Sequence, residues 1–560
     1  MLELLAERAI LLDSPPADVR VPCVGEPGEQ AHPVQLRAVR KTQFSSATPD
    51  SLTIGRAAGT PPRVAPSARQ RAILFRGGTP IEDAYDLVRY PGHAYQRAHP
   101  DPMAVAAILF GMDPVPVEHC RVLEIGCNQG GNLIPMAFGL PESEFTGIDL
   151  APGTIARAQS RIERIGLTNI RVHAMNLLDV GPDLGEFDYI IAHGLYSWVP
   201  APVREKLLAV CRENLSANGV AYVSYNTYPA GHLRRVSRDA MQFHAARAGL
   251  SGEERVREGK AFLKFLLDSV DADGIAKAVY QNEFERQFKR DDEGVFHDEL
   301  SADYSPFYFT DVAEAAARHG LQFLSEARLR DMLNPAVKPE ALQMAAESAG
   351  GDLIAYHQYL DFLVFRGFRE TLLCHGEARL RRDGLAERMG RMWVASPLRK
   401  VGQEAGGTTE FRVPRGAGSI RTNNPATIAA LERLQEIWPQ EERFDDLAGQ
   451  AFLQLASMGL ADLRTHRVPV AARVSERPAA SRLARMEAQE GDVITTLLHR
   501  AIHMEDALAR RFVQLLDGTR DHRALVDCLA ADHPTVPRDT IDAQVRSNLL
   551  ELCRSGVLLV

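Results

Sequence analysis

The chain has 560 residues, 45% of them hydrophobic and 24% charged, and its formal net charge is −9. This length exceeds what one hydrophobic core supports, so we expect a globular protein of two or three domains. The acidic balance argues against nucleic acid as a partner, because a protein that neutralises many phosphates carries a basic excess. The seven cysteines form no C-x-x-C pair, and no stretch approaches the roughly 18 to 20 apolar residues that cross a bilayer. We therefore expect a reduced, cytoplasmic protein with no metal site and no membrane insertion.

The N-terminal part of the chain differs in composition from the rest. Residues 14–80 are rich in Pro, Ala, Arg, Ser and Thr and show no sustained period of two or 3.6. We therefore interpret residues 1–79 as a poorly ordered extension. Regular apolar spacing begins near Ile81, and residues 103–111 (MAVAAILFG) predict a helix ahead of the first strand.

From Arg121 onward, short apolar runs alternate with helical segments, which is the pattern of βαβ units on a parallel sheet. Strands are predicted at residues 121–125, 144–150, 169–175, 187–193 and 220–226. Helices are predicted between them at residues 132–138, 153–165 and 202–215. Right-handed crossovers then make an open, doubly wound sheet.

After Asn226 the alternation stops and later resumes. Residues 232–289 read as mostly helical, a helix follows at 310–319, and two further strands are predicted at 321–327 and 367–375, with a second helical insertion at 339–365. We therefore predict an α/β fold: a seven-stranded Rossmann-like domain over residues 80–380, whose insertions form a regulatory or substrate region at about 230–366. Turn-forming sequences at 385–425 mark a boundary. Residues 390–560 predict a mainly helical, winged-helix-like domain.

A glycine-rich loop, EIGCNQGGN, follows the first predicted strand and opens a helix. Gly126, Asn128, Gly130 and Asn132 belong to this loop, which lets backbone approach a ligand and offers the free N–H groups of a helix N-terminus. The loop alone does not identify the ligand. Glu124 favours S-adenosylmethionine (SAM) over a pyrophosphate cofactor, because a carboxylate repels phosphate but attracts a cationic ligand.

Polar and apolar groups at the next two strand ends fit the same cofactor. Asp149 ends the second strand 18 residues after Gly131 (149 − 131), a spacing at which an acidic residue reaches ribose hydroxyls. Met175, Asn176 and Leu177 at the end of the third strand can sandwich an adenine, with the Asn176 amide at its edge. Leu150, next to Asp149, is also expected to contact the cofactor. A turn role, in which the Asn176 side chain bonds its own backbone, is equally consistent with the sequence.

Aromatic and amide side chains follow the fourth and fifth predicted strands. Ligands of open parallel sheets lie beyond the carboxyl ends of the strands, so His193, Tyr196, Trp198, Tyr225, Asn226 and Tyr228 should border a methyl-acceptor site. Such groups can aim an amine and exclude water. Simple packing against a helix explains Tyr196 and Trp198 equally well.

Eight segments together resemble the bacterial class I methyltransferases with an attached methyltransferase regulatory domain, a family similar to the protein lysine methyltransferases of rickettsiae. The segments are YPGHAYQRAHPD (90–101), VLEIGCNQGGNLIPMAFGLP (122–141), FTGIDLAPGTIARAQ (145–159), LGEFDYIIAHGLYSWVP (184–200), GVAYVSYNTYP (219–229), HDELSADYSPFYF (297–309), ARHGLQFLSEA (317–327) and FRETLLCH (368–375). The resemblance is close over residues 80–380, loose beyond them, and absent from the N-terminal extension.

The resemblance implies a set of SAM contacts. They are Glu124, Gly126, Gly130, Asp149, Leu177 and His193, with Tyr95, Gln96 and His99 as a lid over the donor. Two residues depart from the family pattern: Asn128 replaces a glycine and Asn176 replaces an aspartate. At position 128 the loop can still close, because Asn is the non-glycine residue that best tolerates positive φ. At position 176 the Asn amide keeps an acceptor for the adenine edge.

These observations lead to one working hypothesis and two alternatives. The hypothesis is in-line transfer of the SAM methyl group to a lysine nitrogen of a protein or peptide substrate, with Tyr196, Tyr225 and Asn226 holding the acceptor and Trp198 and Tyr228 contacting the substrate. The first alternative is methylation of a small molecule or peptide natural product. The second is a non-catalytic SAM-binding scaffold that docks partners through the C-terminal domain. A homodimer is left open.

Overall fold

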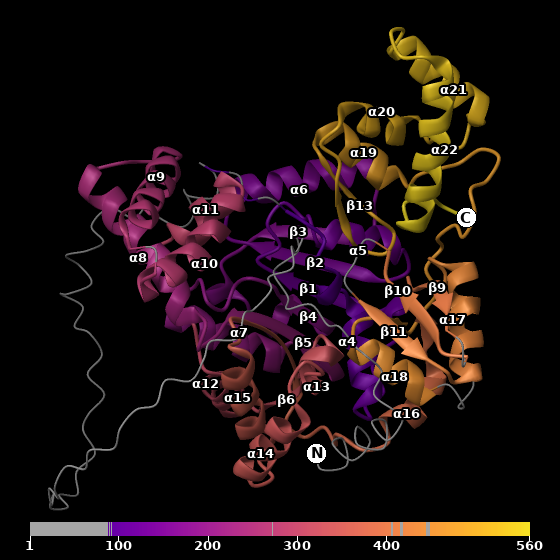
Figure 1. Ribbon diagram of the computed structural model, residues 1–560. Helices are drawn as coiled ribbons and strands as arrows, with labels where there is room; N and C mark the ends of the chain where they lie inside the picture. Colours follow the sequence, from indigo (N-terminus) through magenta and orange to yellow (C-terminus); the bar gives the residue numbers. More distant parts are fainter. Residues whose placement is uncertain are drawn as a thin grey trace, which may run out of the picture. The chain divides into compact units, whose positions relative to one another are not determined.

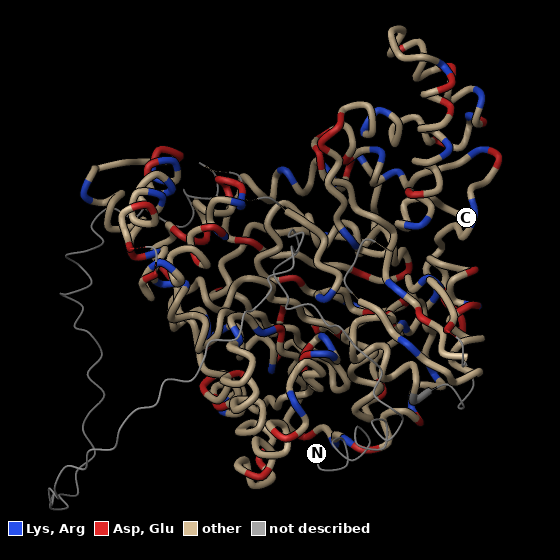
Figure 2. The backbone as a smooth tube through the Cα atoms, viewed as in Figure 1, with Lys and Arg blue, Asp and Glu red and all other residues tan. Residues whose placement is uncertain are grey.

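The computed structural model describes Val88, Tyr90 and residues 92–560, apart from residues 272, 405–406, 415–417 and 444–448. The extension predicted at residues 1–79 lies outside the described residues. Among the residues that are described, no helix combines the length and the apolar character needed to cross a bilayer. Basic and acidic residues are interspersed along the described backbone (Figure 2).

A seven-stranded sheet has the strand order β3-β2-β1-β4-β5-β7-β6. Its strands are β1 (Arg121–Ile125), β2 (Glu144–Asp149), β3 (Ile170–Ala174), β4 (Phe187–Ala192), β5 (Leu215–Asn226), β6 (Leu321–Glu326) and β7 (Phe368–His375). The pairs among β1 to β5 are parallel, whereas β7 pairs antiparallel with β5 and β6. The predicted Rossmann-like sheet is therefore confirmed. β5 begins earlier than predicted, because Leu215 already pairs with Phe187.

Helices cover both faces of this sheet (Figure 1). On one face lie α4 (Pro100–Leu109), α5 (Leu133–Gly139) and α6 (Pro152–Ile165), in a hydrophobic core with Val122 and Tyr222. On the other lie α7 (Ala201–Glu213) and α12 (Phe309–Arg318), in a core with Leu123 and Tyr225. Successive strand residues alternate between the faces. Glu124 therefore shares the α4–α6 face with Val122 and Tyr222, and Tyr225 lies on the opposite one.

Two helical blocks are inserted into the sheet sequence, as predicted. The first comprises α8 (Gly231–Ala248), α9 (Glu254–Ser269), α10 (Ile275–Lys289) and α11 (Asp292–Glu299), and the second α13 (Leu329–Leu333), α14 (Pro339–Ala349) and α15 (Leu353–Val364). The first block has its own core around Met241 and Phe284, and the second a smaller one around Leu342 and Leu360.

The C-terminal part contains more strand than the sequence predicts. Its elements are α16 (Leu385–Arg388), β8 (Trp393–Ala395), β9 (Arg399–Gln403), β10 (Thr409–Arg412), β11 (Ser419–Thr422), α17 (Pro425–Ile437), α18 (Gly449–Ser457), β12 (Asp462–Arg464), α19 (Arg482–Glu490), β13 (Val493–Thr495), β14 (Ala501–His503), α20 (Ala507–Leu515), α21 (His522–Asp532) and α22 (Arg538–Arg554). Short 3-10 helices are η1 (Gln96–Ala98), η2 (Val117–His119), η3 (Leu177–Asp179), η4 (Pro182–Leu184) and η5 (Met389–Arg391). β9, β10 and β11 form an antiparallel sheet.

The C-terminal part contributes side chains to two separate hydrophobic cores. Leu385, Phe411 and Leu434 belong to the same core as helix α4, so this portion is continuous with one face of the large sheet. Phe512, Leu525 and other side chains between residues 471 and 558 form a separate core among α19 to α22. The second core therefore belongs to a compact helical unit with one short hairpin, β13–β14.

Candidate functional site

The loop between β1 and α5 adopts the left-handed backbone that its sequence allows. Gly126, Asn128 and Gly130 have φ angles of 77°, 48° and 76°. The prediction that Asn128 accepts positive φ is therefore confirmed. A Cβ atom on Gly131 would lie 2.4 Å from the backbone carbon of Gly92, so only glycine lets the segment before η1 approach the loop this closely.

Asp149 ties this loop to the end of β2. Its carboxylate accepts hydrogen bonds from the backbone N–H groups of Asn128 (2.8 Å) and Ala151 (3.0 Å). The carboxylate is thus fixed beside the glycine loop at the carboxyl end of the sheet, which is where the ribose of a nucleoside would be gripped. The neighbouring Leu150 is exposed.

Glu124 is a buried carboxylate with one unused oxygen. Its side chain is 3% exposed, and its Oε1 accepts a hydrogen bond from Asn132 Nδ2 at 2.7 Å, whereas its Oε2 has no partner among the residues that the structure describes. Burial raises the pKa of Glu124 to about 8, with a smaller contribution from the charge of Asp149. A buried, unpaired carboxylate oxygen is costly unless a donor or a cation meets it. This oxygen therefore fits a cationic ligand in the loop.

The segment predicted as a lid packs against the same loop. The backbone N–H of Tyr95 donates to Asn132 Oδ1 at 2.9 Å, and the Tyr95 ring stacks on the His193 ring with centroids 3.8 Å apart. Gln96 instead accepts a hydrogen bond from Arg500 Nε at 3.1 Å. His99 caps α4 by accepting from the Asp101 N–H at 3.1 Å. Of the three predicted lid residues, Tyr95 contacts both His193, through its ring, and Asn132, through its backbone N–H.

A hydrogen-bonded chain behind His193 contains residues that the sequence analysis missed. His193 Nδ1 lies 3.0 Å from the hydroxyl of Tyr222, which donates to Glu370 Oε1 at 2.9 Å, and Arg97 grips both oxygens of Glu370 at 3.0 and 2.8 Å. Burial lowers the pKa of His193 to about 4, so the imidazole is neutral near pH 7.

The direction of these bonds fixes the histidine tautomer. Because the Tyr222 hydroxyl hydrogen goes to the Glu370 carboxylate, the 3.0 Å contact with the Tyr222 oxygen favours a proton on His193 Nδ1 over acceptance from the Ser224 hydroxyl, which lies farther away at 3.5 Å. Nε2 of His193 then keeps its lone pair. The signal that could have found this chain was a glutamate, Glu370, within the predicted strand at 367–375, on the Glu124 face of the sheet.

Two of the predicted catalytic residues lie on the opposite face from Glu124. Tyr196 and Tyr225 belong to the core beneath α7, with ring centroids 5.8 Å apart. The Tyr225 hydroxyl bonds Thr371 Oγ1 at 3.0 Å, and both tyrosines are almost fully buried. The structure does not bring them together with Glu124 and His193, and their catalytic role stays a prediction.

The remaining acceptor-side residues contact the first helical insertion. Asn226 Oδ1 accepts a hydrogen bond from Arg234 Nη1 at 2.8 Å, and the same guanidinium lies 5.2 Å from the ring centre of Trp198. The ring of Tyr228 stacks on His232 with centroids 4.1 Å apart. Asn226, Trp198 and Tyr228 therefore connect the carboxyl ends of β4 and β5 to α8.

The predicted adenine-side residues follow β3. Asn176 Oδ1 accepts a hydrogen bond from the Leu178 N–H at 3.0 Å and so caps η3. This is the turn role that the sequence left open. Leu177 is buried in the same turn. Their adenine contacts stay predictions.

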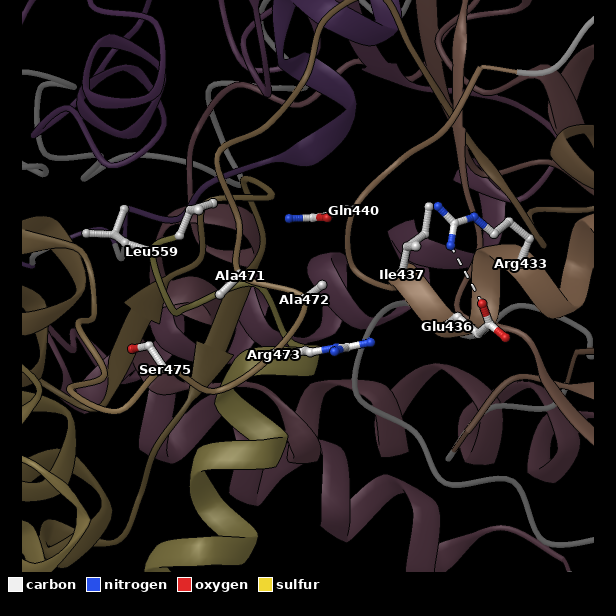
Figure 3. Close-up of a pocket in the computed structure, with 10 residues that line it drawn as sticks. Arg433, Glu436, Ile437, Gln440, Ala471, Ala472, Arg473, Ser475 and Leu559 are labelled. Carbon is white, nitrogen blue, oxygen red and sulfur yellow. Dashed lines mark ion pairs between the residues drawn. The ribbon is translucent and has the colours of Figure 1, made fainter.

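Two further features bear on ligands. Within the part of the chain that the structure describes, no group of three or more His, Cys, Asp or Glu side chains could hold a metal ion. A cavity of about 690 Å³ lies between α17, residues 471–475 and the C-terminus, lined among others by Arg433, Gln440 and Arg473 (Figure 3). None of the predicted site residues lines this cavity.

Family comparisons match three parts of the chain. The family described as "Methyltransferase domain" matches residues 122–219, which span β1 to the start of β5. The family "Predicted methyltransferase regulatory domain" matches residues 291–375. The family "PKMT, C-terminal winged helix domain" matches residues 476–546, within the second C-terminal core.

Similar proteins come from rickettsiae. The uncharacterized protein RP789 of Rickettsia prowazekii is 36% identical over 315 residues, and the match covers 56% of this chain and 56% of that relative. RP028 of the same organism is 32% identical over 242 residues, covering 43% of this chain and 96% of the relative. The structure of PKMT2 from Rickettsia typhi is 25% identical with a TM-score of 0.75, covering 84% of this chain and 100% of PKMT2. A second structure of PKMT2, in complex with AdoHcy, is 24% identical with a TM-score of 0.76.

Proposed function

We propose that this chain, which belongs to the bacterial class I SAM-dependent methyltransferases with a methyltransferase regulatory domain, transfers the methyl group of SAM to a lysine side-chain nitrogen of a protein substrate. The observation that carries the proposal is the unpartnered Oε2 of buried Glu124, beside a glycine loop that Asp149 ties to the next strand. The likeness to PKMT2 and the winged-helix match support a protein acceptor.

The residues around the loop suit a positively charged nucleoside. SAM, when bound, supplies a methyl group bonded to a sulfonium sulfur. When the methyl group is transferred, that sulfur departs readily as a neutral thioether. Glu124 offers its free oxygen to the cationic end, and the Asp149 carboxylate, held by two backbone N–H groups, faces the sugar. The left-handed glycine loop lets its backbone approach the ligand closely.

His193 is our candidate for holding the acceptor nitrogen. Its neutral ring keeps a lone pair on Nε2, because the Tyr222–Glu370 chain fixes the proton on Nδ1. An acceptor lysine must be uncharged to attack, and the aromatic surroundings of Tyr95 and Phe368 disfavour its ammonium form. His193 then accepts a hydrogen bond from the amine and orients its lone pair.

The test is a methyl-transfer assay with the full chain, labelled SAM and lysate of its own host. The proposal predicts labelled protein whose hydrolysate contains methyllysine, with strong loss of label for Glu124→Gln and little change for the matched control Glu118→Gln, an exposed residue just before β1. Label in small molecules alone supports methylation of a small molecule or peptide natural product. SAM binding without any transfer supports a scaffold.

A further inference from the structure

Residues from the C-terminal half contact the predicted lid and the loop behind it. His499 Nε2 lies 2.9 Å from Asn132 Oδ1, and Arg500 Nε donates to Gln96 Oε1 at 3.1 Å. Thr465 donates from both its backbone nitrogen and its hydroxyl to Asp101 Oδ1, at 2.7 and 2.6 Å. The C-terminal half thus contacts the loop after β1, the predicted lid and the first turn of α4.

The contact of His499 reaches Glu124 through one amide. Asn132 Oδ1 also accepts from the backbone N–H of Tyr95, which can only be a donor, so this end of the amide is its oxygen. The Asn132 NH₂ group therefore faces Glu124 Oε1, as the 2.7 Å bond requires. His499 must then donate from Nε2, and its ring is a neutral donor because burial lowers the pKa of His499 well below its usual range.

His499 has a left-handed backbone conformation at this contact. His499 has a φ of 55° in the turn between β13 and β14, where few non-glycine residues occur, and its side chain is 5% exposed. The turn is closed by a hydrogen bond from the His499 N–H to the Thr496 carbonyl at 3.0 Å. The hairpin therefore presents one buried imidazole N–H to one buried amide oxygen.

We infer that His499 is a positioning residue of the methyl-donor site: acting through Asn132, it holds the Glu124 carboxylate in the orientation that receives the cationic end of SAM. The unit matched by the winged-helix family thus completes the cofactor site and sets the affinity for the donor. This inference rests on the proposed function, since it requires Glu124 to meet SAM. His499 itself touches neither donor nor acceptor.

The test compares two substitutions that share the same backbone strain. In His499→Gln the amide nitrogen can still donate to Asn132 Oδ1, whereas His499→Ala removes the donor, and neither Gln nor Ala relieves a positive φ. One lost hydrogen bond should weaken binding of S-adenosylhomocysteine, measured by calorimetry on the full chain, by about three- to tenfold in His499→Ala. His499→Gln should stay within about twofold of wild type, and so should the control His503→Ala, an exposed residue on the same hairpin.

Kinetics and unfolding complete the test. In His499→Ala the KM for SAM should rise by the same factor while kcat at saturating SAM stays nearly constant. Adding Asn132→Ala should cost less in the His499→Ala background than in wild type, because the two residues act on one bond. Equal affinity of wild type and His499→Ala for S-adenosylhomocysteine would overturn the inference. It would also be overturned if His499→Ala and His499→Gln lost the same affinity while both melted at the temperature of wild type. If wild type itself binds no S-adenosylhomocysteine, the proposed function fails instead.

Discussion

Glu124→Gln gives the sharpest test of how the candidate site recognises charge. Glutamine keeps an oxygen that accepts from Asn132 Nδ2, and its NH₂ group replaces Oε2, so the substitution removes both the negative charge and the free acceptor that faces the ligand. The ionised carboxylate should add about 1.5 to 3 kcal/mol to SAM binding, the value of a charge-assisted hydrogen bond, which corresponds to roughly 10- to 150-fold in Kd.

This advantage should depend on pH in a way that the structure sets. Because burial raises the pKa of Glu124 to about 8, only about 9% of the carboxyl is ionised at pH 7 and about 1% at pH 6. The ratio of Kd values, Glu124→Gln over wild type, should therefore rise steeply from pH 6 to pH 8 and level off above pH 9. The ratio cancels the titration of the ligand's own amino group, which both proteins meet equally.

The assay is calorimetry or equilibrium dialysis of SAM against both proteins at pH 6, 7, 8 and 9. A ratio that is close to one at every pH would refute the idea that Glu124 meets the cationic end of the donor. A large ratio that does not change with pH would show that this carboxyl is already ionised at pH 6, which contradicts its burial without a partner.

Three further predictions follow from the same geometry. The raised pKa of Glu124 means that the folded chain binds a proton more tightly than the unfolded one, so stability falls as pH rises from about 4.5 to 8. Glu124→Gln should thus melt at a higher temperature than wild type at pH 9 but not at pH 4, and identical melting curves at pH 9 would contradict this. Asp149→Asn should weaken SAM binding about ten- to hundredfold by losing a carboxylate, and unchanged affinity in dialysis would exclude its sugar contact. Tyr222→Phe and Tyr225→Phe each remove one buried hydroxyl. The value of kcat should fall further in Tyr222→Phe, because Tyr222 and not Tyr225 contacts His193. A larger fall in Tyr225→Phe would favour Tyr225, the residue predicted from the sequence.

The sheet could be predicted because its strands are marked by local patterns. Each of the seven strands is a short segment with apolar residues bounded by helices or turns, and its pattern differs from the 3.6-residue period of the neighbouring helices. β9, β10 and β11 escaped prediction because they are four or five residues long, largely polar and partly exposed, as in RKVGQ (399–403). These strands pair as one small sheet within residues 385–425, where the turn-forming sequences were interpreted as a domain boundary.

From residue spacing, the candidate site was predictable only where its residues are near one another in sequence. Tyr95, which lies on His193, was predicted only through the family resemblance. Glu124, Asn128 and Asp149 fall within 26 positions and share the signature of one strand–loop–helix–strand unit. Tyr222 and Glu370 are 148 residues apart, and Asn132 and His499 are 367 apart. Nothing in spacing or composition links such pairs, because only the strand order and the return of the C-terminal hairpin bring them together.

A structure of the full chain solved with S-adenosylhomocysteine would test the central claim most directly. We expect density for the nucleoside along the β1–α5 loop, with its amino group within hydrogen-bond distance of Glu124 Oε2 and its ribose hydroxyls on Asp149. Density bound elsewhere, such as the cavity beside Arg433 and Arg473, with an empty glycine loop, would contradict the account.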